Sequence, residues 1–436
     1  MTFDASRTDA ARSVGDTLSA AFAGDVAVRR PSARPRRRSP WISVPGRVRL
    51  VALLVVLAAV TWRRGEYFSG SLDPVVLAKA LVSLIALGLA LLLAQAGPRR
   101  LLATGTLWWL GVLLGVSVLG AVTAGNAVAG GVVAVRVAVL AATVVLLLRA
   151  APATQVLTAV AWACGVTSAV AAVTGVGSFL AEGRLAGGIP AIDPNDLALL
   201  AGIAVVALAW RLVLDELSLP ALLASVFFLG VVYATGSRTG LLVLLAAVAL
   251  VVAGIRRPRV ELVVAALVLA ASTVVAVVAT GAVSGFAARG GDGSSTLDSR
   301  FIAWRASLTW ADSSWQQFFG GGLSVKIIRV RGQFWDTQPL DSSWVSLLVQ
   351  AGIVGLVVAG LWMLWVVRGM HRAPREHRIL FQGLLVFVIG RSVLESGLFD
   401  ATPALLVLVA VSLLAEGGTR SRLHDEERTA RSIAPR

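Results

Sequence analysis

Apolar residues along this chain fall in long, nearly uncharged runs, unlike the stripes and alternations of soluble elements. A helix needs about 20 residues to cross a ~30 Å hydrocarbon layer, and many of these runs reach that length. The cores of about twelve such runs are residues 47–62, 74–96, 101–121, 128–148, 154–174, 195–213, 218–234, 239–255, 260–282, 343–367, 379–399 and 402–416. The pattern predicts an all-α, polytopic membrane protein with about 12 transmembrane helices.

Composition agrees with a helical membrane protein and excludes other classes. The 436 residues are 57% hydrophobic and 14% charged, whereas soluble domains carry about 25% charged residues. The runs are too long and too evenly apolar for the strands of an outer-membrane barrel. A single cysteine, Cys164, excludes a disulfide or a multi-cysteine metal site within one chain.

The basic residues lie mostly between the apolar runs. Cationic loops stay in the cytoplasm, and the Arg-rich joints alternate along the chain: Arg99 and Arg100, Arg149, Arg211, 256–259 and 368–378. An even number of spans then places both termini in the cytoplasm of a bacterial plasma membrane. The basic residues that give the net charge of +15 are thus explained by the loops between the spans, and no nucleic-acid partner is predicted.

Three regions follow from this layout. Residues 1–46 are polar, rich in Arg and interrupted by Pro, which predicts a disordered basic cytoplasmic tail. Residues 47–416 form the transmembrane domain, and residues 417–436 form a cytoplasmic C-terminal tail. One large exterior loop, about 283–342, joins helices 9 and 10. Within it, Phe301, Trp304 and Leu308 recur at helical spacing, so part of the loop is expected to lie along the membrane interface.

Two exterior segments carry unexpected charge before the ninth run. In the first, Asp193, Asn195 and Asp196 flank a proline that opens a span, and free amides at such a helix start attract anions. Arg184, eleven residues earlier, could fold back over the same place and suit a phosphate or diphosphate; an ordinary loop and cap is the alternative. In the second, Arg238 lies in a tight exterior turn, 233–240, where it could equally extend to lipid headgroups.

Two further segments follow the large loop's flexible beginning. Arg300 and Arg305 are five residues apart, hence about 140° apart around a helix, and cannot share one face closely. Asp341 opens the tenth span, where it could be a cap. Glu395 lies near the outer end of the eleventh span, one turn after Arg391, and the two could form an intramembrane ion pair.

Familiar catalytic signatures do not occur. The three histidines, His371, His377 and His424, all fall on the predicted cytoplasmic side, so none is available as an exterior base or metal ligand. No Walker loop, HExxH or GxSxG sequence is present, and the Gly-rich segments lack a βαβ context. No cofactor and no metal site are predicted.

Taken together, the exterior motifs resemble a known family. They are Gly-Arg-x-x-Gly with Asp-Pro-Asn at 183–195, Thr-x-Ser-Arg-x-Gly at 235–240, Ser-Arg-x-x-x-Trp at 299–304, Gly320 to Gly322, and Gln-Ala-Gly-Ile-Val-Gly at 350–355. In order and spacing they are similar to the O-antigen ligase/polymerase superfamily. These integral membrane glycosyltransferases use sugars linked to polyprenyl diphosphate on the outer face of the plasma membrane.

The resemblance implies a metal-independent glycosyltransferase. Arg184, Arg238 and Arg300, with Arg305 as a further candidate, would bind the diphosphate, and Asp341 or Glu395 would act as base. Asp193, Asn195 and Asp196 would line the pocket. Ligases of this family carry a His-Asn pair near the end of the large loop, where this chain has Asp341 and Ser342. This difference favours a polysaccharide polymerase, or a divergent transferase in which a carboxylate serves as base.

Other functions stay open on the sequence. One is ligase-type transfer to a lipid or protein acceptor, and another is a secondary transporter or flippase, for which charges such as Arg136, Arg391 and Glu395 inside spans would also be reasonable. A membrane partner without activity is the third. Besides the lipid-linked glycan and the bilayer, a flippase and a chain-length regulator are the expected partners of a polymerase.

Overall fold

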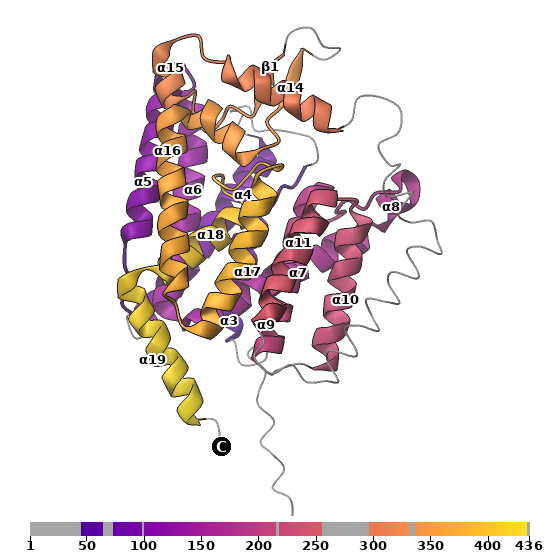
Figure 1. The fold of residues 1–436 in the computed structure, drawn as a ribbon, viewed down its shortest axis with the longest axis vertical. Helices are drawn as coiled ribbons and strands as arrows, with labels where there is room; N and C mark the ends of the chain where they lie inside the picture. The colour runs from indigo at the N-terminus through magenta and orange to yellow at the C-terminus, as the bar shows by residue number, and fades with distance from the viewer. Residues whose placement is uncertain are drawn as a thin grey trace, which may run out of the picture. The chain divides into compact units, whose positions relative to one another are not determined.

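The computed structural model describes residues 45–63, 73–97, 100–214, 218–254, 296–330 and 336–433. The predicted N-terminal tail up to residue 44, the ninth apolar run and the loop residues up to 295 lie outside this description. The described chain is mainly helical (Figure 1). One two-stranded sheet, which the apolar pattern does not predict, corrects the all-α expectation.

A helix is present in every predicted apolar run that lies within the described residues. These helices are α3 (Gly46–Ala59), α4 (Pro74–Ala96), α5 (Gly105–Thr123), α6 (Ala127–Ala150), α7 (Ala153–Thr174), α9 (Pro194–Val213), α10 (Leu219–Ala234), α11 (Arg238–Ala253), α16 (Ser343–His371), α17 (Arg375–Ser392) and α18 (Pro403–Ala415). The described part of the chain has four more helices, which lie outside the runs: α8 (Val176–Glu182), α14 (Thr296–Leu308), α15 (Ser314–Phe319) and α19 (Gly417–Ile433).

Six of the described helices are long and apolar enough to cross a membrane, or seven if the bent pair α18 and α19 is one span. The helices α10 and α11 have 16 residues each, which is about 24 Å at 1.5 Å per residue and shorter than a ~30 Å hydrocarbon layer. The chain is therefore a multi-pass membrane protein. The total of about 12 spans and the exterior position of the large loop stay predictions.

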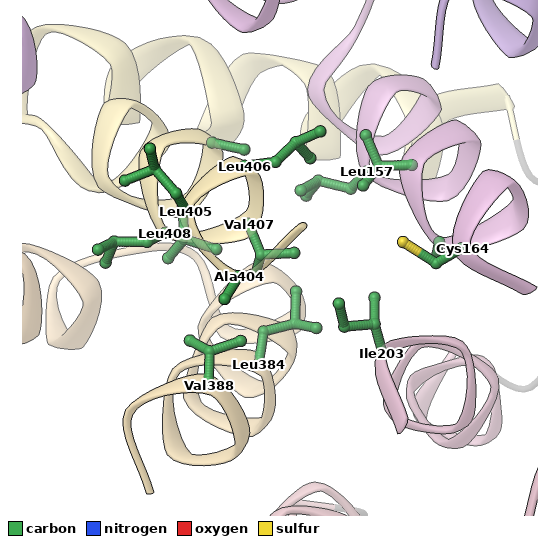
Figure 2. Close-up of a cluster of buried hydrophobic side chains, with 14 of the residues drawn as sticks. Leu157, Cys164, Ile203, Leu384, Val388, Ala404, Leu405, Leu406, Val407 and Leu408 are labelled. Carbon is green, nitrogen blue, oxygen red and sulfur yellow. The ribbon is translucent and has the colours of Figure 1, made fainter. Parts of the chain in front are cut away.

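The centre of the helical assembly is α18, whose residues are all buried. A helix that is hydrophobic all round is stable when neighbouring helices surround it. Figure 2 shows Leu405 to Leu408 in one cluster with Leu157 of α7, Ile203 of α9 and Leu384 of α17. By contrast, 17% of the apolar window of α4 is buried, so α4 presents most of its surface to lipid.

The part of the large loop that the structure describes packs over the first turns of α16. The strands β1 (Ile327–Arg329) and β2 (Thr337–Pro339) pair antiparallel, with Ile328 opposite Gln338. In Figure 1 the helices α14 and α15 and this hairpin gather at the upper ends of α5 and α16. Ile328, Val330 and Leu340 are buried with Ala303 of α14 in a small separate core.

A kink in α16 receives the three consecutive glycines of the loop. Gly352 has φ 65°, a left-handed conformation that favours glycine, and interrupts the helix. There the amides of Gly321 and Gly322 donate to the carbonyls of Val349 and Gln350, each at 2.9 Å. A Cβ at Gly352 would lie 2.3 Å from the Phe318 backbone. The glycine motifs at 320–322 and 350–355, which are separate in the sequence, therefore contact each other in the structure.

At the other end of the helices, α19 turns 84° away from α18 and is held by polar contacts. Arg422 donates to the carbonyls of Leu148 and Ala151, each at 2.8 Å. Glu426 accepts from Arg422 at 2.8 Å and from Arg100 at 3.3 Å. The predicted C-terminal tail is thus largely a helix bound to the ends of α6 and α7.

Candidate active site

The arginine of the first motif contacts two other segments. α8 ends at Glu182, and the next residue, Gly183, has a left-handed conformation (φ 65°). Arg184 donates from Nε to the Thr235 carbonyl at 2.8 Å and from its guanidinium to Asn195 Oδ1 at 3.1 Å. The structure thus brings Arg184 to the start of α9, as the sequence predicts.

The first turn of α9 contacts the end of α17 through two side chains. Asn195 Nδ2 donates to both carboxylate oxygens of Glu395, each at 2.9 Å. Asp196 Oδ1 accepts from Arg391 at 3.1 Å. Arg391 and Glu395, which could have formed an ion pair, have different closest partners, because α17 ends at Ser392 and the chain beyond it turns Glu395 toward Asn195.

Arg300 of α14 connects the large loop to this group. Its guanidinium donates to Glu395 Oε1 at 3.1 Å, and its Nε lies 3.5 Å from Asp341 Oδ2. The side chains differ in access to solvent: Arg300 is 16% exposed, Glu395 11% and Asp341 36%. We call Arg184, Asn195, Arg300, Asp341 and Glu395 the Arg300 cluster.

The electrostatics of the Arg300 cluster favour carboxyl groups that hold protons unusually well. Burial raises the pKa of Asp341, while the neighbouring Arg300 opposes that change. Burial also raises the pKa of Glu395, opposed by Arg391 and then Arg300. Both groups lie outside the membrane-spanning helices. A partly desolvated carboxyl beside a guanidinium can accept a proton and later release it.

Three further predicted site residues lie outside the Arg300 cluster, either beside it or away from it. Arg238 opens α11 and is exposed, three residues after the carbonyl that accepts from Arg184. Arg305 is exposed on a different face of α14 from Arg300, in agreement with their predicted separation. The Asp193 carbonyl accepts from the Leu197 amide at 2.9 Å and so belongs to the first turn of α9.

Three residues outside the predicted site hold the site together. Ser343 donates from Oγ to the Glu395 carbonyl at 2.8 Å, and its Oγ accepts from the Leu398 amide at 3.0 Å. Lys326 and Asp400 form an ion pair at 2.5 Å between the hairpin and the loop after α17. The only available signal for Lys326 was its rarity, since the chain has just two lysines.

Metal ligands do not gather in this region. Within the described ranges, the structure contains no group of three or more His, Cys, Asp or Glu side chains that could hold a metal ion. The fold and the cluster together define a class of protein, a multi-pass helical membrane protein. Its arginines and carboxylates come together from four distant segments, near the points where the helices α9 and α16 begin and α17 ends.

The comparison with known families identifies this class further. The family model of O-antigen ligase matches residues 223–360, about a third of the chain. This match supports the resemblance to the O-antigen ligase/polymerase superfamily that the motifs indicate. The matched region includes Arg238, Arg300 and Asp341 and the two glycine motifs, whereas Arg184, Asn195 and Glu395 lie outside it. No curated protein matches the sequence.

Proposed function

We propose that this protein is a glycosyltransferase that polymerises glycans carried on polyprenyl diphosphate at the outer face of a bacterial plasma membrane. The observation that supports this function best is the Arg300 cluster itself. The cluster draws its residues from five segments: the residues after α8, the first turn of α9, α14, the residues before α16 and the residues after α17. These segments span more than 200 positions of the sequence. Both groups that the reaction needs, cations for a diphosphate and a carboxylate for a hydroxyl proton, are present together.

Two arginines of the cluster suit the leaving group. When the glycosidic bond to the diphosphate breaks, its electron pair stays on the phosphate oxygen, and negative charge develops there. Arg184 is exposed, and the side chain of Arg300 is 16% exposed. Planar guanidinium groups bind two phosphate oxygens at once and need no metal to neutralise them. Arg238, in the turn that Arg184 contacts, would add a third positive charge.

Asp341 is the better base of the two carboxylates. Both oxygens of Glu395 accept from Asn195, and one also accepts from Arg300. The more exposed Asp341 contacts Arg300 through one oxygen. In the proposed reaction, an acceptor hydroxyl gives its proton to Asp341 as its oxygen bonds to the anomeric carbon. Glu395 then positions Arg300, and direct attack gives inversion at that carbon.

The place of Asp341 supports polymerisation over ligation. It lies at the end of the large loop, directly before α16, where ligases of the superfamily carry a histidine. The same hydroxyl-to-carbon transfer would serve an acceptor on a lipid or a protein, so the acceptor decides between the two reactions. A polymerase also needs lipid-linked repeats delivered across the membrane and a control of chain length, for which a flippase and a regulator are the proposed partners.

The test uses the full chain in proteoliposomes with a polyprenyl-diphosphate-linked oligosaccharide. Gel mobility of the glycan measures elongation, and thin-layer chromatography measures the released polyprenyl diphosphate. We expect both products from the wild type, and about 100-fold less of each from Arg184→Gln, as is typical for loss of a charge-stabilising group. Arg329→Gln, which removes an exposed arginine of β1, is the matched control. No elongation by a folded wild-type protein would contradict the polymerase.

A further inference from the structure

A charged cavity lies at the far end of α16 from the Arg300 cluster. Its volume is about 130 Å³, where about 10–15 Å³ is enough for one water molecule. The lining residues come from the end of α16 and the joint between α18 and α19: Trp365, Arg368, Gly369, Arg372, Ala415, Glu416, Gly417 and Arg420. The cavity therefore has room for an ionic group and its waters.

Three of the lining residues are arginines. Arg368 lies in the last turn of α16, and Arg372, four positions later, caps the end of that helix; both are exposed. Arg420 donates to the Gly369 carbonyl at 3.1 Å, which holds its side chain at the cavity wall. Like charges at this spacing repel each other. An anion between them would remove that repulsion.

The one carboxylate of the cavity is already engaged elsewhere. Glu416 accepts from the amides of Gly105 at 2.9 Å and Thr106 at 2.6 Å, at the start of α5. It also accepts from the Thr106 hydroxyl. Glu416 thus stabilises the N-terminus of α5, and one carboxylate cannot balance the charge of three arginines. The cavity keeps an excess of positive charge.

The position along α16 corresponds to lipid headgroups on the other membrane face. Ser343, the first residue of α16, contacts Glu395 of the Arg300 cluster. Arg368 comes 25 residues later, about 37 Å along a helix at 1.5 Å per residue. A bilayer with its headgroups is about 40–45 Å thick. Trp365 beside the cavity fits this depth, since tryptophan is enriched at membrane interfaces.

An apolar surface leads from the cavity toward the membrane centre. Leu361 and Leu364 of α16 are 48% and 68% exposed, one to two turns before Arg368. They lie on the side of the helix that carries Arg368, because residues at spacings of three, four and seven share a face. A ligand with a phosphate head and an acyl tail would contact both regions, whereas a free phosphate would contact only the arginines.

We propose that this cavity binds the phosphate of an anionic phospholipid in the leaflet opposite the Arg300 cluster. Arg368, Arg372 and Arg420 contact the phosphate oxygens, and the acyl chain runs along Leu364 and Leu361. The bound lipid joins the end of α16 to α19. It thereby fixes the joint between α18 and α19 without taking part in glycan transfer.

The experiment titrates delipidated full-length protein in detergent with phosphatidylglycerol and follows bound lipid by native mass spectrometry. The test variant is Arg368→Gln with Arg372→Gln. The control variant is Arg149→Gln with Arg428→Gln, which removes the same charge from exposed residues at the same end of the molecule. Two arginines near an anionic lipid correspond to about a thirtyfold change in affinity. We expect that loss in the test variant and wild-type affinity in the control.

Competition by inorganic phosphate separates the two possible sources of the ligand. Binding of phosphatidylglycerol that persists in millimolar phosphate, and fails with phosphatidylcholine, supports the lipid site. Equal loss in both double variants would mean general attraction to a basic surface and overturn the proposal. Full displacement by phosphate would also overturn it, because the cavity would then take a soluble anion. The assay needs no turnover, so its result is independent of the proposed function.

Discussion

Arg300 and Glu395 lie 95 positions apart in the sequence, yet their guanidinium and carboxylate groups are 3.1 Å apart. The contact joins α14 of the large loop to the loop after α17. Because Arg300 also pairs with Asp341 through a second nitrogen, one side chain connects both candidate bases. The geometry of the site therefore depends on a planar cation with several donors.

Arg300→Lys should lower glycan elongation by about 100-fold while the protein stays folded. Lysine keeps the positive charge but has a single ammonium group, which cannot contact Asp341, Glu395 and a phosphate together. The measurement is the rate of elongation from a lipid-linked oligosaccharide, with the membrane level of each variant determined in parallel. Arg329→Lys in β1 is the control, and a wild-type rate in Arg300→Lys would remove Arg300 from the proposed site.

The pH dependence of turnover should depend on Asp341. A base acts only when it is deprotonated, and burial raises the pKa of Asp341 above the ordinary 3.8, against the effect of Arg300. Turnover should therefore be full above that raised pKa and fall as the pH decreases through it. Initial rates across a pH series would show this limb in the wild type.

Two substitutions assign the limb to its residue. Asp341→Asn should lower the rate and abolish the acidic limb that Asp341 causes. Asp312→Asn, at an exposed position between α14 and α15, should leave both the rate and the limb unchanged. If Asp341→Asn keeps the wild-type rate, the base is Glu395 or no protein group.

Asn195→Asp should destabilise the folded protein. The substitution replaces the donor to Glu395 by a carboxylate, so two negative groups would face each other at about the present 2.9 Å. Loss of a buried hydrogen-bond partner costs about 1–3 kcal/mol, and we expect a lower Tm in detergent. Asn126→Asp is the matched control, because Asn126 is exposed before α6 and makes no side-chain cap. Equal Tm values for both variants would contradict the structural role of Asn195.

Much of the fold could be predicted from the sequence, because an apolar run long enough to span a membrane has few alternatives to a helix. The predicted run 74–96 and the helix α4 have the same bounds. Where the apolar pattern ends, prediction was weaker. The run 379–399 was assigned to one span, but α17 ends at Ser392. The apolar residues Leu398 and Phe399 beyond it are buried in a loop rather than a helix.

The candidate site shows the same limit. Charge on the predicted exterior side of an apolar chain singles out Arg184, Arg300, Asp341 and Glu395. The pairing of these residues could not be predicted, since Glu395 has Arg391 one turn away in sequence but bonds to Asn195, 200 positions away. Tertiary packing decides such pairs. The contact between Gly321 and the kink of α16 escaped prediction for the same reason.

Gly352→Ala should destabilise the protein and disturb the large loop. Position 352 has φ 65°, and a Cβ there would lie 2.3 Å from the Phe318 backbone. Strained backbone of this kind costs about 1–3 kcal/mol, so the thermal unfolding midpoint should fall. Gly360→Ala in the same helix meets no atom within 4 Å and should keep or slightly raise the Tm. If both variants unfold alike, the kink does not hold the glycine contact.

The two ends of the molecule should react from opposite sides of the membrane. The large loop is predicted to be exterior and α19 cytoplasmic, from the alternation of Arg-rich joints. The only native cysteine, Cys164, is buried, so it adds little background to thiol labelling. An impermeant maleimide on intact spheroplasts should label Asp312→Cys at once, and Ser421→Cys only after permeabilisation; both positions are exposed. Labelling of Ser421→Cys in intact cells, with Asp312→Cys protected, would invert the topology. The Arg300 cluster would then face the cytoplasm, where the proposed lipid-linked substrate is not presented, and the proposed function would be lost with it.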